Sequence, residues 1–313
     1  MMDWIYVGLG LVMLLLAGDS LVKGAVNMSL RLGVPALIVS LTIVAFGTSA
    51  PELLIAIQAI WDDVPGLALG NVVGSNTANV LLVLGIPALL ATMHTSECDT
   101  RTSYVQMLAA TGLFIVLCFM GPFTWLSGVI LLAALAAMLG HAMLEAKRHR
   151  RATEDEEEIE GADPSLGWGK IALFLVLGLI GLPLGANLLV DGSTNIAREF
   201  GVTETVIGLT LVAIGTSLPE LATTVMAALR RQADVALGNV IGSNMFNLLG
   251  IMGVASLVGE IPVERGFLTF DLWIMLGASL LLIPFVFLRK DITRIWGVIL
   301  SVAYITYLVV VLA

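Results

Sequence analysis

Two glutamates stand inside long apolar stretches of this chain, and each directly follows a proline. Glu52 lies in "VAFGTSAPEL" at 44–53, and Glu220 lies in "VAIGTSLPEL" at 212–221. An ionisable side chain in such a stretch is costly and by default indicates function. Hydroxyl side chains stand three and four residues before each acid, which places them on the same helix face. They are Thr48, Ser49, Thr216 and Ser217.

The backbone at these motifs offers further oxygen atoms. Pro51 has no N–H, so the carbonyl of Gly47 loses its helical donor, and we expect the carbonyls from Ala45 to Thr48 to be released. Pro219 and Gly215 repeat the arrangement. Free carbonyls at membrane depth must line a cavity or bind something.

Carboxylate, hydroxyl and carbonyl oxygens are the hard ligands that Ca²⁺ and Na⁺ prefer. Two bidentate glutamates with the carbonyls of Thr48 and Thr216 would supply about six oxygens, enough for Ca²⁺. The two acids carry a charge that balances one Ca²⁺ or two Na⁺. No His or Cys stands nearby, which argues against zinc or copper.

A second motif, "GNVVGSNTAN" at 70–79, recurs as "GNVIGSNMFN" at 238–247. Asn71, Ser75 and Asn79 are spaced by four and form one polar helix stripe. Gly70 and Gly74 permit close helix packing, and Asn71 is interpreted as part of the same packing surface. The deepest amides, Asn79 and Asn247, are the better candidates for lining a site.

Composition places the whole chain in a membrane. Its 313 residues are 58% hydrophobic and 12% charged, with a mean hydropathy of +0.99. A soluble domain has about a quarter charged residues, so the soluble class is excluded. Apolar segments of roughly the 20 residues needed to cross a bilayer predict ten spans. They lie near 4–23, 34–60, 67–92, 104–121, 124–144, 169–190, 203–228, 235–258, 267–288 and 294–313.

The chain contains an internal repeat at an offset of 168 residues. Residues 33–85 and 201–253 align without a gap and share 24 identities in 53 positions. Five spans separate the copies, so the second half enters the membrane inverted, as in many secondary transporters. The predicted fold is an all-α polytopic membrane protein with ten transmembrane helices in two inverted five-helix repeats, whose helices 2 and 7 are interrupted. The halves are 1–145 and 169–313, joined by a charged linker at 146–168.

Basic residues predict the orientation. With the linker inside, 13 Lys and Arg residues lie at inside ends and two lie at outside ends. Both termini are therefore expected outside and the linker, including the acidic run "EDEEEIE" at 154–160, in the cytoplasm. The inside residues are Lys23, Arg31, Arg101, Lys147, Arg148, Arg150, Arg151, Lys170, Arg230, Arg231, Arg289, Lys290 and Arg294, and the outside ones are Arg198 and Arg265.

The doubled motifs "GTSAPE…GNVVGSNTAN" and "GTSLPE…GNVIGSNMFN" resemble the two alpha repeats of the sodium/calcium exchangers in the cation/Ca²⁺ exchanger superfamily, most closely the prokaryotic ten-helix inner-membrane type. The resemblance implies that Glu52 and Glu220 are shared Ca²⁺ and Na⁺ ligands. It also implies carbonyl ligands at Thr48 and Thr216. Ser49, Ser217 and the carbonyls of Ala45 and Ala213 would complete the outer and inner Na⁺ positions, and Asn79 and Asn247 would line the middle one.

The expected function is alternating-access exchange of Ca²⁺ for Na⁺ across the bacterial inner membrane. A Ca²⁺/H⁺ exchanger remains an alternative because the same glutamates could titrate, and both amide positions are Asn where some relatives have Asp, which leaves K⁺ coupling and stoichiometry open. A cation channel is a further alternative. No enzyme motif occurs. We expect no cofactor and no nucleic acid, only ions and lipid as partners, with one copy of the chain sufficient for transport.

Overall fold

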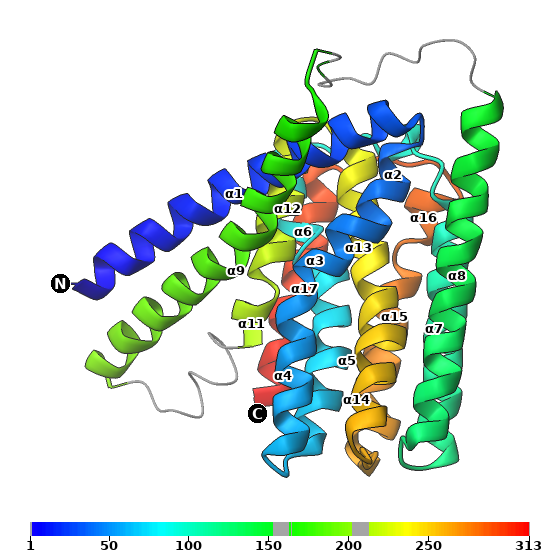
Figure 1. Cartoon of the computed structure of the whole chain (residues 1–313). Coiled ribbons are helices and arrows are strands. Elements are labelled where there is room, and N and C mark those ends of the chain that lie inside the picture. The colour runs from blue at the N-terminus through cyan, green and yellow to red at the C-terminus, as the bar shows by residue number, and fades with distance from the viewer. Residues whose placement is uncertain (1, 153–162, 164, 202–212, 313) are drawn as a thin grey trace.

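The computed structural model describes residues 2–152, 163, 165–201 and 213–312, and in these ranges the chain is helical and connected by short loops (Figure 1). Among the described residues, eight helices are long and apolar enough to cross a membrane, or nine if the pair Ala36–Thr48 and Ala50–Trp61, bent by 41°, is one span. The prediction of an all-α polytopic membrane protein is confirmed. Residues 203–212, the first part of the expected seventh span, and the acidic run 154–160 lie outside the described residues, so the count of ten stays a prediction.

The first half of the chain runs from α1 to α8. Its elements are α1 (Met2–Leu32), α2 (Ala36–Val39), the π-helical turn η1 (Ser40–Val44), α3 (Ala45–Thr48), α4 (Ala50–Trp61), α5 (Pro65–Leu81), α6 (Gly85–Leu90), the 3₁₀ turn η2 (Thr95–Glu97), α7 (Arg101–Met120) and α8 (Trp125–Ala152).

The second half runs from α9 to α17. Its elements are α9 (Trp168–Glu199), α11 (Ala213–Thr216), α12 (Leu218–Leu229), α13 (Ala233–Met245), the π-helical turn η4 (Phe246–Ile251), α14 (Met252–Val258), the π-helical turn η5 (Phe267–Asp271), α15 (Leu272–Leu280), α16 (Ile283–Val286) and α17 (Arg294–Leu312).

The helices α1 and α9 are continuous and lie side by side at an oblique angle to the other helices (Figure 1). Small residues allow this contact. A Cβ built on Gly10 would lie 2.7 Å from the carbonyl oxygen of Gly185, and one on Gly178 would lie 2.6 Å from the Cβ of Leu21. Close backbone approach of this kind is a common way to join helices where no hydrophobic drive exists between them.

In both halves a single serine interrupts the helix within the predicted motif. Ser49 separates α3 from α4 with φ −84° and ψ 5°. Ser217 separates α11 from α12 with φ −87° and ψ 4°. The prolines then fall in the first turn of α4 and α12, where the missing N–H costs nothing because first-turn N–H groups have no helical partner.

Two isolated backbone bridges close the loops at the ends of the bundle. Met93 exchanges both backbone hydrogen bonds with Ile292, and Phe123 does so with Ile261. Met93 and Ile261 are separated by the 168-residue offset, and Phe123 and Ile292 by one residue more. Each bridge therefore joins the loop after the third span of one half to the loop after the fourth span of the other half. This equivalence supports the proposed repeat.

Glycines bring α13 against the interrupted helix of the first half. A Cβ on Gly242 would lie 2.4 Å from the Leu41 carbonyl oxygen and 2.6 Å from the Cβ of Ala45, and one on Gly238 would lie 2.8 Å from the Leu37 carbonyl oxygen. Ser40 strengthens the contact by donating to the Val235 carbonyl. For the matching Gly70 and Gly74, the segment expected opposite, 205–209, lies outside the described residues.

We predict that Gly242→Ala destabilises the protein by roughly 1–3 kcal/mol, because the new methyl group meets backbone that must move. Thermal unfolding in detergent, followed by size-exclusion chromatography, measures the effect. The matched control is Gly112→Ala in α7, where nothing within 4 Å meets the added Cβ. Alanine is the better helix former there, so this variant should unfold at the same temperature or higher. Equal melting temperatures for the two variants would contradict the assigned contact.

Candidate ion site

The two glutamates are buried at equivalent helix starts. Glu52 and Glu220 are each 1% exposed and stand in the first turns of α4 and α12. The partial positive charge of a helix N-terminus favours an anion in this turn, typically by 0.3–1 kcal/mol. That contribution offsets only part of the cost of burying a carboxylate.

Contacts across the repeats bring the two motifs together. The Ser49 hydroxyl donates to Glu220 Oε1 at 3.1 Å. The Thr48 hydroxyl lies 3.3 Å from Asn239 Oδ1 on α13 and 3.3 Å from its own helix carbonyl at Ala45. The first-half interruption therefore faces the second-half glutamate directly.

Two asparagine side chains lie beside the backbone carbonyls of the glutamates. Asn71 Nδ2 is 3.5 Å from the Glu52 carbonyl oxygen, and Asn239 Nδ2 donates to the Glu220 carbonyl at 3.3 Å. Asn239 also donates to the Thr224 hydroxyl at 3.1 Å. Asn71 was interpreted above as helix packing. The structure adds that it binds the site motif itself, as its repeat mate does.

Several buried side-chain oxygens have no hydrogen-bond partner among the described residues. Buried polar atoms are almost always paired, so each exception needs a reason. Of eight such oxygens, five belong to predicted ligands: the Oε2 atoms of Glu52 and Glu220, the Oδ1 atoms of Asn79 and Asn247, and the Oγ atom of Ser217. The others belong to Thr194, Ser243 and Ser301, none of which the motifs predicted as a ligand. The side chains of Asn79 and Asn247 are 1% exposed.

The local helix geometry at Asn79 and Asn247 is irregular. Asn247 lies within the π-helical turn η4, and the chain after Asn79 leaves regular helix between α5 and α6. Such turns widen the helix and are frequent at functional sites. A residue count alone does not reveal them, because the apolar pattern continues through both segments.

The remaining predicted ligands are Ala45, Thr216 and Ala213. The Ala45 carbonyl is not released as expected, since it accepts the Ser49 N–H at 3.1 Å and the Thr48 hydroxyl at 3.3 Å. The cause is that Pro51 removes the donor for Gly47, two residues later, and leaves the turn at Ala45 intact. Thr216 is half-buried, and Ala213 is the first described residue of α11.

No basic side chain forms an ion pair with either glutamate within the described ranges. In the same ranges, no group of three or more His, Cys, Asp or Glu side chains is arranged to hold a metal. The acidic content of this cluster is therefore two carboxylates, with amides and hydroxyls around them. Such a set matches ions that bind weakly enough to leave again.

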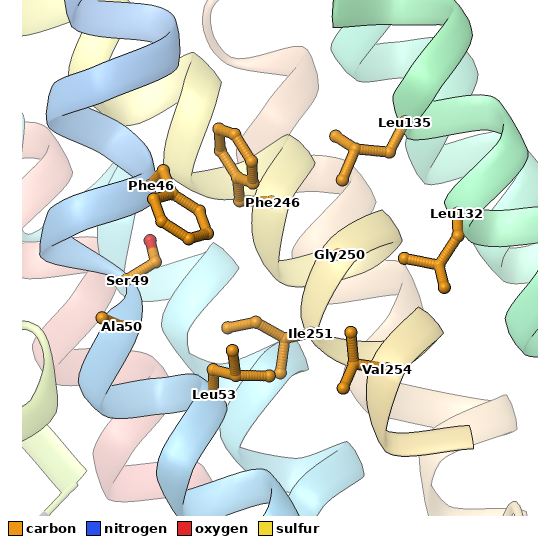
Figure 2. A pocket seen from close by; sticks show the side chains of 10 residues that line it. All are labelled: Phe46, Ser49, Ala50, Leu53, Leu132, Leu135, Phe246, Gly250, Ile251 and Val254. Atoms are coloured by element: carbon orange, nitrogen blue, oxygen red, sulfur yellow. The ribbon is translucent and has the colours of Figure 1, made fainter. Parts of the chain in front are cut away.

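An apolar cavity of about 120 Å³ adjoins the interruption (Figure 2). Figure 2 shows Phe46 and Leu53 on one side, with Leu132 and Leu135 of α8 opposite. Ser49 provides the single polar side chain of its lining. One hydroxyl cannot replace the hydration shell of a cation, so this cavity is distinct from the cluster of unpaired oxygens.

Comparison with known proteins agrees with this geometry. The family model of the sodium/calcium exchanger protein matches residues 2–144 and 170–313. The chain is 35% identical to the sodium/calcium exchanger MaX1 of Methanosarcina acetivorans, covering 96% of both chains, and 32% identical to the inner membrane protein YrbG of Escherichia coli, covering 87% of this chain and 85% of that one.

Among solved structures, the chain resembles the sodium–calcium exchanger NCX_Mj soaked with Na⁺ and Ca²⁺. The TM-score is 0.83 at 31% identity, with 98% of this chain and 97% of that one covered. The chain therefore belongs to the sodium/calcium exchanger protein family. It is a membrane transporter of the cation/Ca²⁺ exchanger type and not an enzyme.

Proposed function

We propose that this member of the sodium/calcium exchanger family is an antiporter that carries Ca²⁺ in one direction and Na⁺ in the other through a single buried site. The observation that carries the proposal is the set of unpaired oxygens on Glu52, Glu220, Asn79 and Asn247, buried with no basic partner in the described ranges. Uncompensated carboxylates in a membrane interior require a positive charge. A bound cation supplies it and also satisfies the oxygens.

The ligands of the proposed site come from both repeats. The carboxylates of Glu52 and Glu220 bind either ion, and the amide oxygens of Asn79 and Asn247 complete the middle of the site. The hydroxyls of Ser49 and Ser217 and the carbonyls of Thr48, Thr216, Ala45 and Ala213 supply the outer and inner positions. Because Ca²⁺ and Na⁺ use the same carboxylates, only one set of ions is carried at a time.

Proton or K⁺ coupling is the alternative. Two carboxylates can exchange Ca²⁺ for protons if they titrate during the cycle, and an additional K⁺ would need further oxygens. The amides at Asn79 and Asn247 cannot titrate, so proton coupling would rest on the two glutamates alone. This limited acidity favours Na⁺ as the counter-ion.

The two halves of the molecule differ in a way that indicates one stage of alternating access. On one side α1 packs along α12: a Cβ on Gly18 would lie 3.0 Å from the Ala222 carbonyl oxygen, and Ala222 is 7% exposed. The repeat mate of Ala222 is Leu54 on α4, which is 68% exposed. Within the described residues α9 makes no comparable contact with α4. Within the described residues, α1 thus covers α12 while no helix covers α4 in the same way, and we infer that the site is closed toward the end of α12.

An ion pair joins α1 to the end of α12. Arg230, just after α12, donates to Asp19 of α1, and Lys23 lies 3.0 Å from the same carboxylate. The repeat mates of Asp19 and Arg230 are Asn187 and Asp62, which cannot form an ion pair. The equivalent positions of the other half therefore carry no matching ion pair. We infer that α1 and α9 move together and that the Asp19–Arg230 pair stabilises the present state.

The proposed arrangement in the cell follows from the basic residues. Both termini face outward, the 146–168 linker faces the cytoplasm, and the membrane is the inner membrane of a bacterium. The halves 1–145 and 169–313 form the two inverted units, and one chain contains a whole site. In this orientation the described state is closed to the cytoplasm.

Replacing one carboxylate removes half of the charge that binds the cation. We predict that Glu52→Gln and Glu220→Gln each abolish Ca²⁺ uptake driven by a Na⁺ gradient in reconstituted vesicles. The matched control is Glu260→Gln, a change of the same kind at an exposed glutamate. It should transport as the wild type does. Wild-type exchange by either buried variant would refute the site.

Coupling is tested by varying Na⁺, K⁺ and H⁺ gradients separately in vesicles that contain the wild-type protein. We expect Ca²⁺ uptake to follow the Na⁺ gradient at fixed pH and without K⁺. Uptake that follows the pH gradient and ignores Na⁺ would establish the proton alternative, and uptake that requires K⁺ would establish the other. Labelled Ca²⁺ counterflow distinguishes an exchanger from a channel, which cannot sustain it.

Removal of the Asp19–Arg230 ion pair should shift the equilibrium between the states open to the two sides of the membrane. We predict that Asp19→Asn lowers the labelling of Leu54→Cys by an impermeant maleimide from outside and raises that of Ala222→Cys from inside, each in a background without Cys98 and Cys118. The paired exchange Asp19→Arg with Arg230→Asp should restore much of the original pattern. Unchanged labelling at both reporters would contradict the role of the ion pair.

A further inference from the structure

The amides of the proposed site are themselves held by a second pair of amides. Asn79 Nδ2 donates to Asn244 Oδ1 at 3.1 Å, and Asn247 Nδ2 donates to Asn76 Oδ1 at 3.3 Å. Asn76 and Asn244 are each 1% exposed. Each bond crosses from one repeat to the other, so neither half can order its own site amide alone.

The second pair of amides, Asn76 and Asn244, which we call the outer amides, each donate to a methionine sulfur. Asn244 Nδ2 lies 3.7 Å from Met107 Sδ, and Asn76 Nδ2 lies 3.8 Å from Met275 Sδ. Both methionines are 0% exposed. Met107 and Met275 are separated by 168 residues, the same offset that separates Asn76 from Asn244 and Asn79 from Asn247. The structure thus contains two equivalent three-residue relays.

The chemistry of the three groups gives each relay a direction. A thioether can accept a hydrogen bond but cannot donate one, whereas an amide has a donor end and an acceptor end that exchange places when the group rotates by half a turn. The sulfur therefore fixes the Nδ2 end of the outer amide toward itself. The Oδ1 end must then face the site amide and accept a hydrogen bond from its Nδ2.

The last atom of each relay is the unpaired oxygen. With Nδ2 of Asn79 and Asn247 occupied, their Oδ1 atoms face away from the relay, and both are buried without a partner in the part of the chain that the structure describes. An amide turned the other way would present N–H groups, which repel a cation. Sulfur is a soft ligand and competes weakly for Ca²⁺ or Na⁺, so a methionine can set this orientation without binding the ion.

We propose that Asn76 and Asn244 are positioning residues, and that Met275 and Met107 fix their orientation so that Asn79 and Asn247 present oxygen to the transported cation. The inference rests on the proposed function of the site. It assigns a role to four side chains that do not contact the ion and that the motif comparison within the sequence did not single out.

The test compares Ca²⁺ dependence of exchange in four proteins. Met107→Leu keeps a buried apolar side chain of similar volume but removes the acceptor, and Asn244→Leu removes the relay between Met107 and Asn79. The matched control is Met252→Leu, another methionine with 0% exposure, whose sulfur forms no hydrogen bond in the described part of the chain. We expect the KM for Ca²⁺ to rise about tenfold in Asn244→Leu and about threefold in Met107→Leu, since an unoriented amide loses one hydrogen bond's worth of binding.

A structural role alone would lower the melting temperature without moving the KM. Beside the transport assay we therefore measure the melting temperature of each variant without Ca²⁺ and the rise in that temperature when Ca²⁺ is added. A raised KM with a near-normal maximal rate and a smaller Ca²⁺-induced stabilisation supports the proposal. A KM equal to that of Met252→Leu in both variants overturns it. If the wild type shows no Ca²⁺/Na⁺ exchange, the proposed function fails instead, which the wild-type vesicles reveal before any variant is compared.

Discussion

Two carboxylates are buried in an apolar helix bundle without a basic partner in the described ranges, and the remaining structure is arranged around this charge. The energy needed to bury an isolated carboxylate is several kcal/mol even after relaxation. Helix N-termini and a few hydroxyl groups offset a part of it. A cation that enters and leaves can offset the remainder, and this requirement links the stability of the site to transport.

The interrupted helices solve a geometric problem that follows from that charge. A continuous helix would keep its carbonyls in the helical ladder and present only side chains to an ion. Ending α3 at Thr48 and α11 at Thr216 allows a new helix N-terminus to begin beside each glutamate. The glycine crossing between α13 and the first-half segment then brings the second motif close enough for Thr48 and Ser49 to reach Asn239 and Glu220. Close packing and charge placement therefore depend on each other.

Much of this could be predicted from the sequence because the signals are local or duplicated. Apolar length predicts the membrane fold, proline predicts the helix starts, and the buried acids identify the site motifs. The partners of each amide could not be predicted, because Asn76 and Asn247 meet only when the two repeats are packed together. The π-helical turn at Asn247 and the bound carbonyl of Ala45 depend on backbone geometry that an apolar pattern does not encode. The difference in exposure between Ala222 and Leu54 could not be predicted either, because two nearly identical motifs give no reason for their surroundings to differ.

The central claim is that one cation site is shared by Ca²⁺ and Na⁺ through the unpaired oxygens of the two repeats. Equilibrium binding of ⁴⁵Ca²⁺ to the purified protein in detergent, with Na⁺ added at increasing concentration and K⁺ as the ionic-strength control, tests it without any need for transport. We expect saturable Ca²⁺ binding that Na⁺ displaces completely and K⁺ does not. Absence of saturable binding, or binding that Na⁺ leaves unchanged, would refute the shared site.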